Sequence, residues 1–182
     1  EVHLRITAKA GDEKEAKKLI KPVVKELRNR FGSNIYTTDE SKTLEEAIVD
    51  LLLEKQLTLT TAESCTGGML AARLTNVPGV SEVFKQGLVT YSNRAKRKLL
   101  DVKKNTLKDC GAVSDKTAKE MAKNGAFITG SDICVSVTGI AGPDGGTEEK
   151  PVGLVYMACS YNNKVTVKEF HFKGERSKVR ES

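Results

Sequence analysis

Apolar and polar positions change their spacing along the chain, and this divides it into segments. Residues 2–8 alternate between apolar and polar side chains, which predicts a strand with one buried face. From 16 to 31, apolar residues recur at three- and four-residue steps, which predicts an amphipathic helix capped by Asp12 and ended by Gly32. Pro22 lies inside this helix and lacks the N–H group that the helix needs there, so we expect a bend.

A polar, turn-rich stretch at 33–42 follows, and it suits a domain boundary. Thr43 and Glu46 then match a capping box at the start of the next helix. The residues expected on the buried face of that helix are Leu44, Ala47, Ile48, Leu51 and Leu52. We expect residues 1–42 to be the tail of something truncated upstream, because one strand and one helix cannot form a stable domain. Residues 43–182 form the second predicted domain.

Strand and helix patterns alternate through the rest of the chain. Strands are predicted at 57–63, 84–92, 132–139, 153–162 and 164–173, and helices at 67–75, at 93–100 and after Ser114. Asn162 and Asn163 suit a tight hairpin between the last two strands. This order predicts an α/β fold, a three-layer α/β/α sandwich with a mixed, mainly parallel sheet. The closing residues KVRES look like the beginning of another helix.

Composition narrows the class of protein. The chain has 182 residues, of which 38% are hydrophobic and 30% charged, as in soluble globular proteins. Four scattered cysteines without zinc spacing suggest a reducing cytoplasm. The chain has only two histidines, His3 and His171, and they are isolated near opposite ends of the sequence. This scarcity argues against a Ser-His-Asp triad or a histidine-rich metal site. The net charge of +6 includes the basic run 93–104, which is either a solvated helix face or a surface for an anionic partner.

Candidate chemistry lies where predicted strands end, because ligands of open α/β sheets gather beyond the carboxyl ends of the strands. The stretch AESCTGG, residues 62–68, follows the strand 57–63 and places Ser64 at a strand-to-helix turn. Such a turn can present a nucleophile beside backbone N–H groups that stabilise an oxyanion. In the alternative interpretation, Ser64 and Thr66 cap the helix and Cys65 is a small core residue.

A nucleophilic serine needs a base, and no histidine lies in a suitable motif. A desolvated lysine can serve instead, as in serine–lysine hydrolases. Lys96 is the candidate, because it follows Tyr91 by five residues across a strand end and the first turn of a helix. Tyr91 could then hold or relay the proton. Lys96 could equally be one more surface lysine of a basic helix.

The stretch VTGIAGPDGG, residues 137–146, follows the strand 132–139. It does not match a phosphate-binding P-loop, because no Gly-Lys-Ser/Thr closes it. Its glycines suit either a backbone cradle for a phosphate or ribose or a long turn.

Together these motifs resemble one family. TAESCTGG, GLVTYSNRAK, GAVS, SVTGIAGPDGG with TEEKPVG, and FKGERSKVR, in this order, are similar to the C-terminal domain of the CinA proteins. The stand-alone form of that domain is a nicotinamide-nucleotide amidase. Residues 1–42 resemble the second half of the KH-like segment that precedes it. The resemblance therefore implies a fragment that lacks the large N-terminal domain and the terminal helix of CinA.

The resemblance implies hydrolysis of the carboxamide of nicotinamide mononucleotide, without metal or cofactor. Ser64 would be the nucleophile, Lys96 the base and Tyr91 an assisting group. The residues expected to contact the substrate or its oxyanion are Thr66, Gly67, Thr138, Gly139 and, for the phosphate, Arg176. We expect a cytoplasmic protein without membrane contact and, for the intact protein, a homodimer.

A non-catalytic binding module for nucleotides or nucleic acid is the alternative. The KH-like segment and the basic run 93–104 favour nucleic acid. Against it, residues 1–42 contain no GXXG loop and aromatic residues make up only 5% of the chain, so stacking platforms are scarce.

Overall fold

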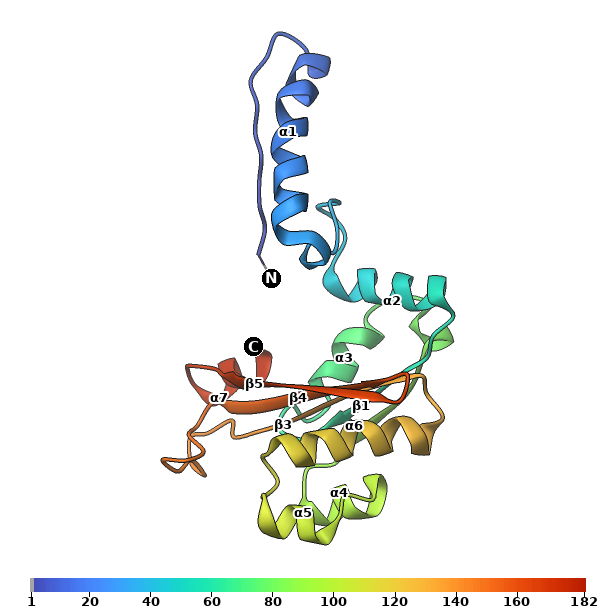
Figure 1. Ribbon diagram of the computed structural model, residues 1–182, viewed down its shortest axis with the longest axis vertical. Coiled ribbons are helices and arrows are strands. Elements are labelled where there is room, and N and C mark those ends of the chain that lie inside the picture. The colour runs from blue at the N-terminus through green and yellow to red at the C-terminus, as the bar shows by residue number, and fades with distance from the viewer. Residues whose placement is uncertain (1) are drawn as a thin grey trace. The chain divides into compact units, whose positions relative to one another are not determined.

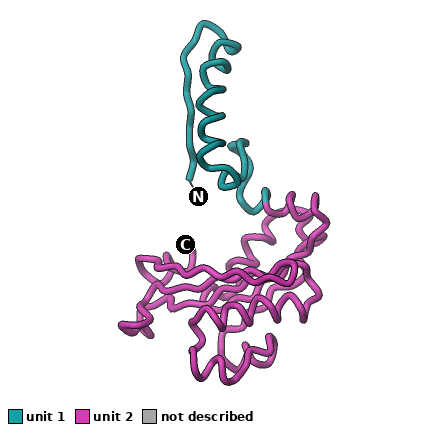
Figure 2. The backbone as a smooth tube through the Cα atoms, viewed as in Figure 1, with its two compact units in different colours: residues 1–47 teal, residues 48–182 magenta. Residues whose placement is uncertain are grey.

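A computed structural model describes residues 2–182 in two compact units, one that ends at Ala47 and one that runs from Ile48 to Ser182 (Figure 2). The smaller unit contains helix α1 (Glu13–Phe31), the short 3-10 helix η1 (Gly32–Asn34) and the start of helix α2 (Leu44–Lys55). Asp12 caps α1 by accepting a hydrogen bond from the Glu15 N–H at 2.8 Å, as predicted. The boundary predicted between residues 42 and 43 stays a prediction.

The strand predicted at 2–8 is wrong. Residues 2–10 belong to no helix or strand, and in Figure 1 they run beside α1 as an extended segment. The physical reason is that a strand needs a partner for its N–H and C=O groups, and the five-stranded sheet of the described chain begins only at Leu59. Helix α1 itself has no buried residue and continues through Pro22.

Helix α2 starts at the predicted capping box. The Thr43 N–H donates to Glu46 Oε2 at 2.7 Å, and the Glu46 N–H donates back to Thr43 Oγ1 at 3.2 Å. The predicted buried face is partly wrong, because Leu51 is 54% exposed and Val49 is buried in its place together with Leu52. A turn of 3.6 residues brings Val49 and Leu52, rather than Leu51, onto the face that packs on the sheet.

A five-stranded mixed sheet forms the centre of the larger unit, in the order β2-β1-β3-β4-β5. The strands are β1 (Leu59–Glu63), β2 (Phe84–Val89), β3 (Ile133–Gly139), β4 (Leu154–Tyr161) and β5 (Lys164–His171). Strand β1 is parallel to both β2 and β3, and only β4 runs against the other four strands. The α/β class and the mixed, mainly parallel sheet are therefore as predicted. Asn162 and Asn163 both have positive φ at the β4–β5 turn, which confirms the hairpin.

Helices cover both faces of this sheet, so the architecture has three layers (Figure 1). Helix α3 (Met69–Thr75) packs on one face with the buried part of α2, around a cluster that includes Val49, Leu59 and Leu74. Helix α6 (Asp115–Thr129) packs on the other face, where Met121 joins a second cluster with α4 (Asn93–Leu100) and α5 (Lys104–Asp109). Helix α5 was not predicted, since its sequence KNTLKD carries only one apolar residue.

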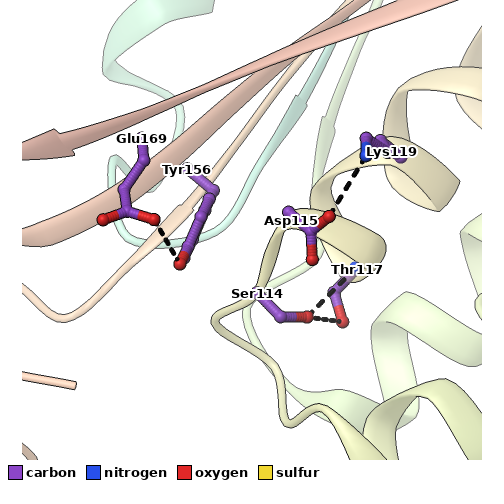
Figure 3. Close-up of polar contacts among 6 residues, drawn as sticks. All are labelled: Ser114, Asp115, Thr117, Lys119, Tyr156 and Glu169. Atoms are coloured by element: carbon purple, nitrogen blue, oxygen red, sulfur yellow. Dashed lines mark hydrogen bonds and ion pairs between the residues drawn. The ribbon is translucent and has the colours of Figure 1, made fainter. Parts of the chain in front are cut away.

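Two short elements complete the unit: the 3-10 helix η2 (Val80–Glu82) and the helix α7 (Arg176–Glu181). Ser114 caps α6 as predicted, with its hydroxyl accepting a hydrogen bond from the Thr117 N–H at 3.1 Å (Figure 3). Within residues 2–182, none of the helices has both the length and the apolar character that a membrane crossing requires.

Candidate active site

Ser64 follows β1 directly, at the carboxyl end of the strand. Its N–H donates to the Val137 carbonyl of β3 at 2.9 Å, so the parallel pairing of β1 and β3 extends to Ser64. Side chains alternate along a strand, which puts Ser64 on the same face as Thr60 and Ala62, the face covered by α6. The residue is only 8% exposed.

Lys96 comes to the same point from α4. Ser92 caps this helix by accepting a hydrogen bond from the Ala95 N–H at 3.0 Å, which fixes Lys96 in the first turn. The lysine is 1% exposed, and its Nζ lies 2.8 Å from Ser64 Oγ, 2.8 Å from the Thr90 carbonyl and 3.4 Å from the Tyr91 carbonyl. The structure thus brings together the predicted nucleophile and its predicted base.

Burial lowers the pKa of Lys96 from 10.5 to about 8, and the nearby Cys65 partly opposes this shift. No ion pair that involves Lys96 occurs within residues 2–182, so no carboxylate offsets the cost of burying its charge. At pH 7 about one molecule in ten then carries a neutral amine at this position. Neutral Lys96 still has two hydrogens for the two carbonyls and a lone pair for the Ser64 hydroxyl.

The turn between β1 and α3 is fixed by Glu63, which is fully buried. Its carboxylate accepts hydrogen bonds from the N–H groups of Gly68 at 2.9 Å, Leu70 at 3.1 Å and Ala71 at 2.8 Å. Glu63 therefore satisfies the free N–H groups at the start of α3. The alternative in which Thr66 caps this helix is wrong, because Thr66 Oγ1 is buried without a hydrogen-bond partner in the described chain.

The two glycines of the turn adopt left-handed backbone conformations, with φ of +63° at Gly67 and +99° at Gly68. A Cβ at Gly67 would lie 3.3 Å from Arg180 Nη2, so an arginine fills the space that the missing side chain leaves. The Gly67 N–H donates to the Ser64 carbonyl at 3.0 Å and is engaged within the turn.

Arg180 of α7 also bonds to this turn: Nε donates to the Cys65 carbonyl at 3.0 Å and Nη2 to the Thr66 carbonyl at 3.1 Å. The sequence reasoning missed Arg180, and it missed the role of Glu63. The spacing of 115 residues between Arg180 and Cys65 carries no local signal, and an acid before a Ser-Cys pair is not by itself diagnostic.

Tyr91 reaches Lys96 through its carbonyl, whereas its phenol lies elsewhere. The side chain is 59% exposed, and the hydroxyl accepts a hydrogen bond from Arg176 Nη2 at 2.9 Å. Arg176 Nη1 also donates to the Gly142 carbonyl at 2.6 Å. Arg176 therefore joins the end of β2 to the glycine-rich loop after β3, and the structure places it beside Tyr91.

Thr138 and Gly139 end β3, beside the end of β1. Thr138 is 1% exposed and its Oγ1 donates to the Ala112 carbonyl at 2.8 Å. A Cβ at Gly139 would lie 2.8 Å from the Leu154 carbonyl oxygen, so this glycine permits the close approach of β4. Both residues therefore lie next to Ser64, but Thr138 is bonded to Ala112 and Gly139 is packed against β4.

Cys65 lies beside Ser64 but in a different environment. It is 7% exposed and packs with Val137, Val155 and Val179. Burial raises the pKa of its thiol, although the N–H groups of Cys65 and Thr66 and the charges of Lys96 and Arg180 partly oppose this effect. A thiol of raised pKa carries little reactive thiolate, so Ser64 is the better placed nucleophile.

His171 of the larger unit lies on β5, three strands from β1, and is not part of this arrangement. His171 Nε2 lies 2.7 Å from Glu169 Oε1, and the Tyr156 hydroxyl donates to Glu169 Oε2 at 2.8 Å (Figure 3). This exposed group of β4 and β5 neighbours the Asp115–Lys119 ion pair of α6 in Figure 3. Residues 2–182 contain no group of three or more side chains arranged to hold a metal ion.

Comparison with protein families gives two matches that together span most of the chain. Residues 41–182 match the CinA C-terminal domain, and residues 1–37 match the KH domain of damage-inducible protein CinA. The chain belongs to the CinA family. Relatives named competence-damage inducible proteins include one of Clostridium novyi, 56% identical over 181 residues, and one of Clostridium perfringens, 58% identical over 180 residues. The match to the Clostridium novyi relative covers 100% of this chain and 44% of the relative, and the match to the Clostridium perfringens relative covers 99% and 43%. The chain therefore spans less than half the length of these two relatives.

Solved structures of CinA proteins share this fold. A competence/damage inducible protein from Agrobacterium tumefaciens is 43% identical with a TM-score of 0.74, over 75% of this chain and 84% of that one. A CinA superfamily protein from Escherichia coli is 34% identical with a TM-score of 0.74, over 82% of this chain and 90% of that one. The resemblance drawn from the sequence motifs is thereby confirmed at the level of the family.

Proposed function

We propose that the CinA domain of this chain hydrolyses the carboxamide of nicotinamide mononucleotide to nicotinate mononucleotide and ammonia. The observation that carries the reaction type is the buried hydrogen bond of 2.8 Å between Lys96 Nζ and Ser64 Oγ, in which the lysine has a lowered pKa of about 8. A desolvated lysine beside a serine hydroxyl is a known way to activate a nucleophile without histidine. The choice of substrate rests on the resemblance of the motifs to nicotinamide-nucleotide amidases.

In the first half-reaction, neutral Lys96 takes the proton of the Ser64 hydroxyl as Oγ attacks the carboxamide carbon. The carbonyl oxygen of the substrate becomes an oxyanion, which the N–H groups of Cys65 and Thr66 are proposed to bind. When the carbonyl re-forms, the C–N bond breaks and ammonia leaves with the proton that Lys96 had taken. The product is an ester between Ser64 and the nicotinate moiety.

In the second half-reaction, water attacks the ester carbon while neutral Lys96 accepts one of its protons. The bond between Ser64 Oγ and the carbonyl carbon then breaks, and Lys96 returns the proton to Oγ. The sum is one carboxamide and one water converted to one carboxylic acid and one ammonia, with the enzyme restored.

The remaining predicted residues are proposed to bind the substrate. Arg176 uses two of its five N–H donors on Gly142 and Tyr91, which leaves donors for the phosphate. Thr66 Oγ1 is buried without a hydrogen-bond partner within residues 2–182, and it is proposed to bind a polar group of the substrate. Thr138 and Gly139 would shape the neighbouring wall, and Gly67 contributes by the shape of the turn, since its N–H is engaged.

Ammonia release from nicotinamide mononucleotide by the protein and by two adjacent variants tests this proposal. Ser64→Ala should lower kcat by at least about 1000-fold, because the covalent route is lost. Cys65→Ala, the matched control in the next position, should retain most of the activity. Loss of activity in the cysteine variant alone would overturn the assignment of Ser64.

Binding of an anion without turnover is the second candidate. It is favoured by a groove of about 470 Å³ on α4 and α5, whose lining includes Arg94, Arg97, Lys98 and Lys104. Filter binding with RNA, run beside the ammonia assay, separates this candidate from the amidase. RNA binding without ammonia release would favour the binding module. The homodimer and the cytoplasmic location stay predictions.

A further inference from the structure

Arg180 makes contacts that the proposed reaction leaves unexplained. It lies on α7, 115 residues beyond Cys65, and its guanidinium spans two successive carbonyls of the turn that follows Ser64. The neighbouring Val179 is 4% exposed and packs with Cys65 and Val137, so α7 is fixed against the same turn. The guanidinium is therefore held in place by packing as well as by its own hydrogen bonds.

The carbonyl of Cys65 and the N–H of Thr66 belong to one peptide group. A trans peptide group is planar, and its C=O and N–H point in opposite directions. The hydrogen bond of 3.0 Å from Arg180 Nε to the Cys65 oxygen therefore sets the direction of the Thr66 N–H. No other hydrogen bond to this carbonyl is found in the described part of the chain.

We infer that Arg180 is a positioning residue that holds the Thr66 N–H in the direction required to bind the oxyanion formed on Ser64. The inference rests on the proposed acyl transfer. The far end of the turn is held independently, because the Glu63 carboxylate binds the N–H groups of Gly68, Leu70 and Ala71. The Gly67 N–H closes the turn around the peptide group between Cys65 and Thr66 by donating to the Ser64 carbonyl at 3.0 Å, and Arg180 donates to the carbonyl of that peptide group itself.

An arginine is required here because two acceptors must be bound at once. The planar guanidinium offers donors in a fixed fork, whereas a lysine ammonium is a single point charge. The turn is built to admit this fork, since a Cβ at Gly67 would approach Nη2 to 3.3 Å. Gly67 thus makes room for Arg180 as well as adopting a positive φ.

The test measures ammonia release from nicotinamide mononucleotide by Arg180→Ala and Arg180→Lys in the full chain. Loss of one oxyanion donor typically lowers the rate by about 100- to 1000-fold. Partial misorientation should lower kcat by about 10- to 100-fold, with KM changed less than about threefold. Arg180→Lys keeps the positive charge but loses the planar fork. An equal fall in kcat in both variants would therefore show that the geometry of the guanidinium, and not its charge, orients the Thr66 N–H. Lys178→Ala, on the exposed side of the same helix, should leave kcat unchanged.

Two further readouts separate positioning from a purely structural role. Guanidinium at millimolar concentrations should restore part of the kcat of Arg180→Ala, while leaving Lys178→Ala unaffected. Hydrogen exchange of the amides in residues 64–68 should accelerate in both Arg180 variants, with the exchange of α6 unchanged. If Arg180→Ala does not fold, Arg180→Lys decides by the same kcat measurement.

A kcat within twofold of the wild type in either variant would overturn the inference, and so would a loss that resides in KM alone. If the unmodified protein releases no ammonia, the proposed function fails. In that case unchanged hydrogen exchange in the Arg180 variants would overturn the positioning role as well, whereas faster exchange would leave Arg180 as the residue that orders the turn.

Discussion

The turn after β1 and the loop after β3 are both rich in glycine, but glycine serves a different purpose in each. Beside Gly67 in the first turn, the space of the missing side chain is occupied by the Arg180 guanidinium. In the loop after β3, a Cβ at Gly142 would lie 2.6 Å from Val152 Cγ1, so an apolar side chain of the same loop fills the space. A glycine pattern in the sequence thus indicates close approach, and only the approaching group tells whether the segment carries chemistry or packing.

This contrast predicts that substitutions in the turn after β1, or of Lys96 that contacts it, lower the rate of ammonia release. Substitutions in the loop after β3 should instead lower the free energy of unfolding. The largest effect is expected for Lys96→Met, which replaces the base with an apolar chain of similar length. Loss of a general base typically lowers kcat by about 100- to 10,000-fold. Ammonia release at pH 8 measures this, with circular dichroism to show that the variant folds.

The same variant has a stability signature. The folded pKa of Lys96 is about 8 and the ordinary value is 10.5, so between these values the unfolded chain binds more protons than the folded one. The free energy of unfolding of the wild type should therefore receive from Lys96 a contribution that rises with pH between 8 and 10.5. Lys96→Met should lack this rise, and equal pH dependence in both proteins would contradict the burial of a titrating amine.

Gly142→Ala should destabilise the fold by about 1–3 kcal/mol, because its Cβ collides with Val152 and because φ is +78°. Val152→Ala removes the colliding group, so the double variant should recover part of the loss. Chemical denaturation of the two single variants and the double variant measures this coupling. Additive losses would show that crowding by Val152 is not the cause.

The smallest effect is expected for Tyr91→Phe. Its hydroxyl accepts a hydrogen bond from Arg176 at an exposed position, and such a bond contributes about 0.5–1.5 kcal/mol. If Arg176 binds the phosphate, KM for nicotinamide mononucleotide should rise by about 2- to 10-fold with little change in kcat. A large fall in kcat instead would support the other role considered for Tyr91, that of a proton relay.

Local sequence signals predicted most helices and strands of the described chain. The capping residues Asp12, Thr43 and Ser114 each act at the helix start where they were expected, because a cap depends on a few neighbouring residues. The strand at 2–8 was wrong because alternation does not supply a pairing partner. Leu51 was also misplaced: the spacing of apolar residues put it on the buried face, but the spacing does not show which face packs on the sheet, and Leu51 is exposed.

The candidate site could be predicted only in part. Ser64 and Lys96 were proposed as a pair from motifs, but their contact depends on β1 and β2 lying side by side, which the order of strands alone does not specify. Arg180 could not be found, because nothing in its own surroundings indicates a partner more than a hundred residues away. Glu63 was visible in the sequence, but its role follows from three N–H groups that only the folded turn directs at it.

The pH dependence of kcat/KM for ammonia release tests the central claim most directly, that neutral Lys96 activates Ser64. Burial places the pKa of Lys96 near 8, so only the neutral fraction is active below that value. Between pH 6 and 8, kcat/KM should rise about tenfold per pH unit and then level off above about pH 8. A rate that stays flat from pH 6 to 9 would contradict the account.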